Sequence, residues 1–202
     1  MKPKKLVCGV GINDADYAIT KWGTIGYVNG EQKKKLVWAC SFYKTWKNML
    51  DRCYSVKFQE RQPTYIGCTV SKEWLTFSNF KNWMMTQDWE GNHLDKDLLF
   101  EGNKVYSPET CVFVSRVVNN FTIDRGAARG EFLIGVYWHK GANKFLSQCS
   151  NPFTKKQEGL GYFDCEQEAH EAWLTRKLEL AYELAAIQTD ERVAEALIDW
   201  YL

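Results

Sequence analysis

The feature that most constrains the fold is a single change of hydrophobic periodicity in the C-terminal third of the chain. Three segments of strand-like composition cover residues 131–139, 144–150 and 160–163. A helical pattern follows at once and continues to about residue 186, and Asp164 and Gln167 have the spacing of a helix-capping box. We therefore expect a small antiparallel sheet covered on one face by a long helix, with a last helix at residues 189–201.

Apolar residues at spacings of three and four predict two helices in the N-terminal half of the chain. The first covers residues 41–53, with Ser41 as its N-cap, and the second covers residues 72–86. Because the aromatic side chains fall at helical spacing, we interpret them as core residues instead of surfaces for base stacking.

The charge is uneven along a chain whose formal net charge is only +1. Residues 1–60 hold eleven lysines and arginines against five acidic residues, whereas residues 179–202 hold one against six. A basic body is compatible with a polyanionic partner. Within residues 1–36 we expect glycine-marked turns and a solvated lysine run at 33–35, for which contact with a phosphate backbone is the alternative.

Seven cysteines are present, and no two have CxxC spacing, so we expect no zinc framework. Buried free thiols in a reducing compartment are the favoured interpretation. No stretch approaches the roughly 20 apolar residues of a membrane helix, and no signal peptide opens the chain. These observations predict a cytoplasmic protein.

Residues 92–121 predict a strand, a polar loop, a second strand and a short helix that begins after Ser115. The run HLDKD at residues 93–97, the turn YSPETC at 106–111 and the pair Asn119 and Asn120 resemble the core of phage and homing HNH endonucleases. A run at residues 43–54 is also similar to segments common in phage proteins of this group. The resemblance covers roughly residues 40–121 and implies an HNH endonuclease-like domain at residues 1–121, which consists of an N-terminal extension and a ββα-metal core.

The same resemblance implies roles for individual residues. His93 would be the general base that activates water for phosphodiester hydrolysis. A divalent ion, Mg²⁺ or Mn²⁺, would clamp the phosphate, and its ligands would be Asn92, Asp95, Asn119 and Asn120. Asp97 would be a further oxygen donor nearby.

Two regions depart from the family pattern. Asn92 stands where the family has an acid or a histidine, and Thr110 and Cys111 occupy the region of the asparagine that orients the catalytic histidine. Amide oxygens are weaker ligands for a hard cation than carboxylates. The alternative is therefore a catalytically inactive DNA-binding protein, regulatory or host-interacting, in which Asp95 and Asp97 only order the loop.

Four short runs resemble AP2 DNA-binding domains in composition and order: GVYW at 135–138, KF at 144–145, LGYFD at 160–164 and EAHEAW at 168–173. The resemblance implies an AP2-like module at residues 131–202, joined through a linker at 122–130. The uncovered sheet face would lie in a DNA groove. The expected DNA contacts are Arg125, Arg129, Tyr137, His139, Lys140 and Lys144, and Ser147 is also expected to point outward.

The sequence thus predicts an α+β fold: an HNH-like core, then a three-stranded antiparallel sheet with one packed helix and a C-terminal helix. The predicted function is a metal-dependent DNA endonuclease or nickase, targeted to double-stranded DNA by the AP2-like module. The acidic C-terminal helix, with Trp200 and Tyr201 exposed, is the alternative docking surface for a host protein. A helix packed on the body is the favoured interpretation of that segment.

Overall fold

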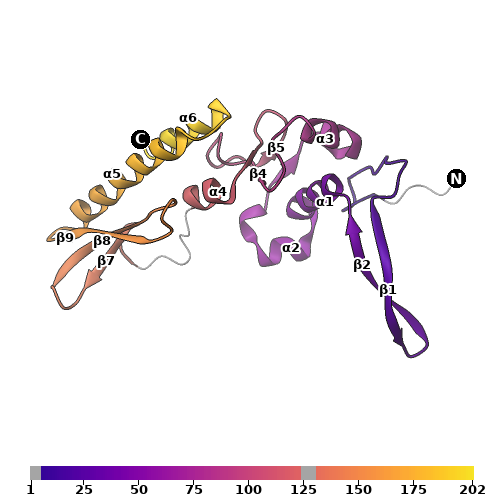
Figure 1. Cartoon of the computed structure of the whole chain (residues 1–202), viewed down its shortest axis with the longest axis horizontal. Coiled ribbons are helices and arrows are strands. Elements are labelled where there is room, and N and C mark those ends of the chain that lie inside the picture. Colours follow the sequence, from indigo (N-terminus) through magenta and orange to yellow (C-terminus); the bar gives the residue numbers. More distant parts are fainter. Residues whose placement is uncertain (1–5, 124–130) are drawn as a thin grey trace. The chain divides into compact units, whose positions relative to one another are not determined.

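The chain is an α+β protein that divides into two compact units, one ending at Phe113 and the other beginning at Val114. The computed structural model describes residues 6–123 and 131–202, and Figure 1 traces both units. Each unit is considered by itself. The domain bounds expected from the motifs (1–121, 122–130 and 131–202) remain predictions.

The first unit combines short helices with two-stranded sheets. Its pairings are β1 with β2, β3 with β5 in parallel, and β4 with β6. The last residue of β6, Val114, is the first residue of the second unit. Its elements are β1 (Thr20–Val28), β2 (Glu31–Ala39), α1 (Ser41–Tyr54), α2 (Val56–Arg61), η1 (Pro63–Tyr65), β3 (Thr69–Val70), η2 (Glu73–Leu75), α3 (Phe77–Met84), β4 (His93–Asp95), β5 (Val105–Tyr106) and β6 (Val112–Val114).

Aromatic side chains at helical spacing form the core of this unit, as the sequence predicts. Trp46 of α1 and Trp74 of η2 are fully buried, and the Trp46 indole N–H donates to the Trp74 carbonyl at 2.6 Å. Phe77 and Phe80 of α3 complete the cluster, with the Phe77 ring tilted against Trp46 and the Phe80 ring edge-on to Trp74. Burying a large apolar side chain contributes about 1.5–3 kcal/mol, so this cluster is the main source of stability in the unit.

Two predictions for these helices are wrong in detail. The helix expected at residues 72–86 is broken at Thr76, because the backbone there pairs with Ile12 instead of continuing the helix. The Ile12 N–H donates to the Leu75 carbonyl at 2.7 Å. Ser41 is the first residue of α1, and the N-cap is Cys40, which provides no side-chain capping bond.

The N-terminal segment forms a long antiparallel hairpin where the sequence pattern predicts only turns. Asn29 and Gly30 connect β1 and β2 with φ angles of 51° and 81°. Two consecutive left-handed residues give the tight turn whose twist suits a hairpin, and Asn-Gly is its preferred sequence. The Lys33–Lys35 run lies on β2.

The second unit is a three-stranded antiparallel sheet with a long helix on one face. The sheet order is β7-β8-β9, and α5 packs along all three strands. Its elements are α4 (Arg116–Thr122), β7 (Val136–His139), β8 (Lys144–Ser150), β9 (Gln157–Phe163), α5 (Glu166–Ala185) and α6 (Glu191–Asp199). The sheet-and-helix arrangement agrees with the expectation from periodicity.

Side-chain contacts correct one prediction in this unit and one part of the alternative interpretation of its C-terminal helix. Asp164 does not cap α5, because the N-cap is Cys165 and the Asp164 carboxylate pairs with Lys144 at 3.1 Å. Tyr201 is not an exposed aromatic residue: it is 9% exposed, and its hydroxyl donates to the Phe121 carbonyl at 2.6 Å. The C-terminal helix is therefore packed on the body, as the favoured interpretation holds, with α6 against α5.

Candidate functional site

The open face of the β7-β8-β9 sheet carries the candidate site. Directly opposite residues of an antiparallel pair point to the same face, and the direction alternates along each strand. Tyr137 is opposite Leu146, which in turn is opposite Tyr162, and His139 is opposite Lys144. These five side chains therefore share one face of the sheet.

The other face is the one that α5 covers, and its contacts fix the orientation of the sheet. Val136, Ser147 and Cys149 alternate with the residues of the open face, and all three are buried. Gly135 lies against the Trp173 indole so closely that a Cβ atom at this position would be 2.1 Å from the ring. The Trp173 indole of α5 therefore packs directly against the backbone at Gly135. Small residues on the contact surface of α5 allow this close approach.

Ser147 corrects one sequence-based prediction. It was expected to point outward toward DNA, but it is fully buried on the helix-covered face. The register gives the reason, because Ser147 is opposite Val136 and next to Leu146. Tyr162 also lies on the open face, and its position there follows from the strand register and not from the sequence pattern.

Two tyrosines and a histidine dominate the open face. Tyr137 is 53% exposed and Tyr162 51% exposed, and the His139 and Tyr162 rings meet edge to face with centroids 5.1 Å apart. His139 Nδ1 accepts a hydrogen bond from the Ala142 backbone N–H at 3.1 Å. The neutral imidazole therefore carries its proton on Nε2, and that N–H remains a donor.

The expected phosphate contacts differ in their surroundings. Lys140 lies in the β7–β8 turn and is exposed. Lys144 is held by the Asp164 carboxylate, and this exposed pair is weak enough to open for another anion. Arg125 and Arg129 lie outside the described residues.

The second predicted site is centred on His93 in the first unit. His93 begins β4 and is exposed, and among the described residues none donates to or accepts from its imidazole. The neighbouring Asn92 amide is used in a turn, where it donates to the Asp88 carbonyl at 2.8 Å and to the Asp88 carboxylate at 3.3 Å. The imidazole is thus accessible, and the neighbouring Asn92 side chain is anchored in the turn through its amide nitrogen.

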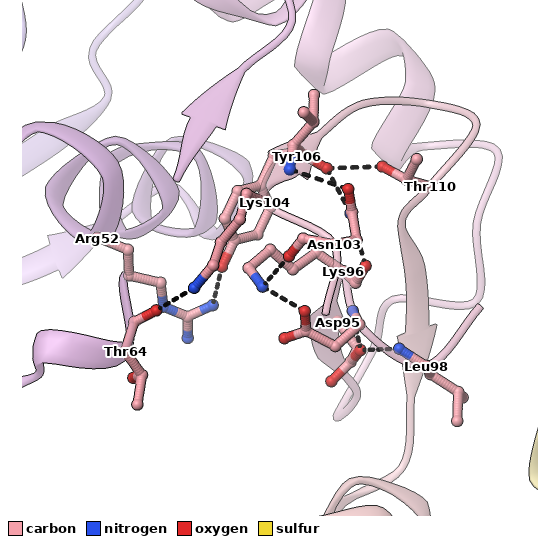
Figure 2. Close-up of polar contacts among 11 residues, drawn as sticks. Arg52, Thr64, Asp95, Lys96, Leu98, Asn103, Lys104, Tyr106 and Thr110 are labelled. Atoms are coloured by element: carbon pink, nitrogen blue, oxygen red, sulfur yellow. Dashed lines mark hydrogen bonds and ion pairs between the residues drawn. The ribbon is translucent and has the colours of Figure 1, made fainter. Parts of the chain in front are cut away.

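Asp95 orders the loop that follows β4, as Figure 2 shows. Its Oδ1 atom accepts from the backbone N–H groups of Asp97 and Leu98, each at 2.8 Å. Asp97 accepts from the ammonium of Lys96, which is 5% exposed and also donates to the Asn103 carbonyl at 2.6 Å. Both carboxylates thus take part in the hydrogen bonds that order this loop.

Asn103 closes this loop from the other side. Its amide donates to the carbonyls of Lys96 and Val105, both at 2.8 Å, and its oxygen accepts from the Val105 N–H at 3.0 Å. Thr110 continues the chain of contacts by donating to the Val105 carbonyl at 2.7 Å. Because the polar atoms in this loop bind one another, the loop is specified by its own side chains.

The residues at the family's histidine-orienting position are also used structurally. The Thr110 hydroxyl contacts Ser107 at 3.1 Å, and the Cys111 side chain is fully buried in the aromatic core, where burial raises the pKa of the thiol to about 12. Tyr106, also buried, accepts from the Arg52 guanidinium at 3.3 Å, and burial raises the pKa of its phenol. Figure 2 shows Arg52, Tyr106 and Thr110 in this region.

The expected metal ligands are divided between the two units. Asn92 and Asp95 belong to the first unit, and Asn119 and Asn120 lie on α4 of the second. All four offer oxygen atoms, which suit Mg²⁺, but only Asp95 is charged and one of its oxygens is occupied. In the described part of the chain, no three His, Cys, Asp or Glu side chains form a group that could hold a metal ion.

Comparisons of the chain with models of protein families, with curated proteins and with solved structures find no match. Over residues 6–123 and 131–202, no helix is long and apolar enough to cross a membrane. The HNH-like and AP2-like resemblances therefore remain predictions based on the residues quoted for them.

Proposed function

We propose that this protein binds double-stranded DNA through the open face of its β7-β8-β9 sheet. The observation that supports the proposal is the division of this sheet into a face sealed by α5 and a face that exposes Tyr137, His139 and Tyr162. A sheet with one covered and one uncovered face is a stable platform. Strands of this kind are known to present side chains to base edges in a DNA groove.

The chemistry of the face suits a nucleic acid. Tyrosine hydroxyls and the His139 Nε2–H are donors for phosphate or base acceptors, and the tyrosine rings supply flat apolar area. Lys140 and Lys144 lie at the β7–β8 end of the same sheet and add positive charge. A phosphate that displaces Asp164 from Lys144 would exchange one weak surface ion pair for another.

The test is the affinity of the whole chain for a long mixed-sequence duplex, measured by fluorescence anisotropy at several salt concentrations. We expect binding that weakens as salt rises, because phosphate contacts release counterions. The double variant Tyr137→Ala, Tyr162→Ala should bind about tenfold less tightly, which corresponds to ~1.4 kcal/mol.

The matched control is Tyr182→Ala, since Tyr182 is 52% exposed on α5, away from the sheet. It should leave the affinity unchanged. Absence of salt-sensitive binding by the unmodified chain, or an equal loss in the control, would refute the proposal.

As a second candidate function we propose HNH-type cleavage or nicking of DNA with His93 as general base. Two observations favour it: the exposed imidazole without a partner among the described residues, and the pairing of β4 with β6, which α4 follows along the chain. Asn92 and Asp95 are the residues of the first unit that would hold a Mg²⁺ or Mn²⁺ ion, which would supply charge stabilisation for the leaving oxygen. The lone pair of an imidazole ring nitrogen can accept a proton from water.

Incubation with supercoiled DNA and Mg²⁺ or Mn²⁺ separates this candidate from DNA binding alone. Nicked or linear product is expected with metal and not with a chelator. His93→Ala should abolish the product and keep the affinity for DNA. Unchanged cleavage by this variant would remove His93 from the reaction, and binding without cleavage would leave the inactive DNA-binding protein.

A further inference from the structure

The β1–β2 hairpin has no role in the proposed function, and it is the largest exposed feature of the first unit. Its strands pair with each other over nine residues each, and within the described residues neither packs extensively on another helix or strand. Its base is fixed where the Cys40 N–H donates to the Ile19 carbonyl at 2.9 Å. A two-stranded hairpin without a core is only marginally stable in water, so a partner would stabilise it.

The side chains of the hairpin are cationic and aromatic. Its strands carry four lysines, Lys21 and the run 33–35, against one acidic residue, Glu31. The exposed rings are large: Trp22 is 61% exposed, Tyr27 68% and Trp38 45%. Such a surface is complementary to a polyanion that also offers flat, stackable groups.

The backbone of the hairpin has the shape of a groove-binding ribbon. Its register shifts twice, between Lys21 and Trp22 and between Thr24 and Gly26, which marks two bulges. Bulges increase the right-handed twist of a strand pair. Nine residues extend ~30 Å, roughly the rise of nine nucleotides along one strand, and the major groove admits a two-stranded ribbon.

We propose that the β1–β2 hairpin is a second DNA-binding element, which enters a groove of the duplex and neutralises phosphates with the lysines at 33–35. This inference rests on the proposed function, because the open sheet face and the hairpin would bind the same polymer. Two elements in one chain raise each other's effective concentration on DNA, so the hairpin contributes affinity even where its own contacts are weak.

The experiment compares two triple variants of the full chain that remove the same charge. Lys33→Gln, Lys34→Gln, Lys35→Gln changes the hairpin, and Lys44→Gln, Lys57→Gln, Lys72→Gln changes exposed lysines elsewhere in the first unit. The affinity for a long mixed-sequence duplex is measured from low to high salt. In the hairpin variant the negative slope of log K against log salt should become less steep by about 2 to 3. In the control variant it should become less steep by less than one.

The outcomes separate the inference from the proposed function. Equal slopes in the two variants, with DNA binding intact in both, would overturn the hairpin's role and leave the sheet face as the DNA site. Absence of DNA binding by the unmodified chain would refute both the hairpin inference and the proposed function. Vesicles of phosphatidylcholine and phosphatidylserine form a second arm, and lysine-dependent binding to them with an unchanged DNA slope would assign the hairpin to a membrane surface instead. Thermal unfolding followed by circular dichroism verifies that each variant is folded.

Discussion

The ammonium group of Lys177 lies 3.5 Å from the ring centroid of Phe121 and donates to the carbonyl of the same residue at 2.9 Å. Lys177 belongs to α5 and Phe121 to α4, so one side chain joins these two helices of the second unit through two different interactions. The Lys177 ammonium group also lies over the Tyr201 ring, 4.9 Å from its centroid. Burial lowers the pKa of Lys177 from 10.5 to about 8, since little water remains to solvate the charge.

This pKa predicts how stability depends on pH. The folded chain binds fewer protons than the unfolded chain between about pH 8 and pH 10.5, so the free energy of unfolding should increase as the pH rises through that range. In Lys177→Met this increase should be smaller by on the order of 2 kcal/mol. Urea unfolding at pH 7.5 and pH 10.5 measures this increase in the free energy of unfolding. Lys156→Met, at an exposed lysine, is the control, and an equal slope in both variants would contradict the assignment.

Gly135→Ala should destabilise the second unit by about 2 kcal/mol or more. Gly135 has φ +80°, and a Cβ atom there would meet the Trp173 ring at 2.1 Å, so both the backbone and the indole would have to move. Gly159→Ala in the same sheet is the control, because a Cβ atom there would meet nothing within 4 Å. Thermal unfolding compares the two variants, and similar losses in both would show that the contact with Trp173 is not responsible.

Asn103→Ala should loosen the loop between β4 and β5. The variant removes three side-chain hydrogen bonds. The Val105 N–H and the Lys96 carbonyl lose their Asn103 partner, whereas the Val105 carbonyl keeps its bond from Thr110, and the expected cost is about 1–3 kcal/mol. Amide hydrogen exchange of residues 96–105 should accelerate. Asn48→Ala, at an exposed asparagine of α1, should change neither quantity. Unaltered exchange in Asn103→Ala would mean that the loop is held by other contacts.

Glu158 predicts a loss of stability in acid. Hydrogen bonds from Arg176 and Asn151 lower the pKa of Glu158, so the folded chain favours its charged form. The stabilisation is present above the unfolded pKa near 4.5 and disappears as the pH falls through the lower folded value. Glu158→Gln should therefore lose less stability than the unmodified chain between pH 6 and pH 3. Glu183→Gln, which removes a more distant partner of Arg176, is the comparison.

The elements that the sequence predicts correctly are those whose periodicity reflects burial. The helix at 41–53, the sheet and α5 each have an apolar face against a core, and Ser115 caps α4 by accepting from the Val118 N–H at 3.2 Å. The hairpin was missed because it is largely exposed and its apolar residues follow no buried face. The Asn29-Gly30 turn was the signal that could have identified it.

The candidate site was predictable only in part, because strand register is a tertiary property. Alternation along β7 predicts that Tyr137 and His139 point to the same face of the sheet. It cannot predict that Tyr162 of β9 shares this face, because that depends on its pairing with Leu146 of β8. The sequence predicts the wrong face for Ser147 for the same reason, since its pairing with Val136 is also a property of the register. Around His93 the sequence suggested metal ligands, whereas backbone N–H groups of the loop after β4 occupy one oxygen of Asp95.

The two bulges of the β1–β2 hairpin also affect how separate copies of this chain meet. Both strands are edges, and an unpaired edge rich in Trp, Ile and Val is a template for a strand of another molecule. A bulge interrupts the regular row of N–H and C=O groups, and a lysine on the edge opposes the approach of an identical strand. The irregular register, together with the lysines at 33–35, should therefore keep the protein from aggregating edge to edge while its largest exposed apolar element is uncovered.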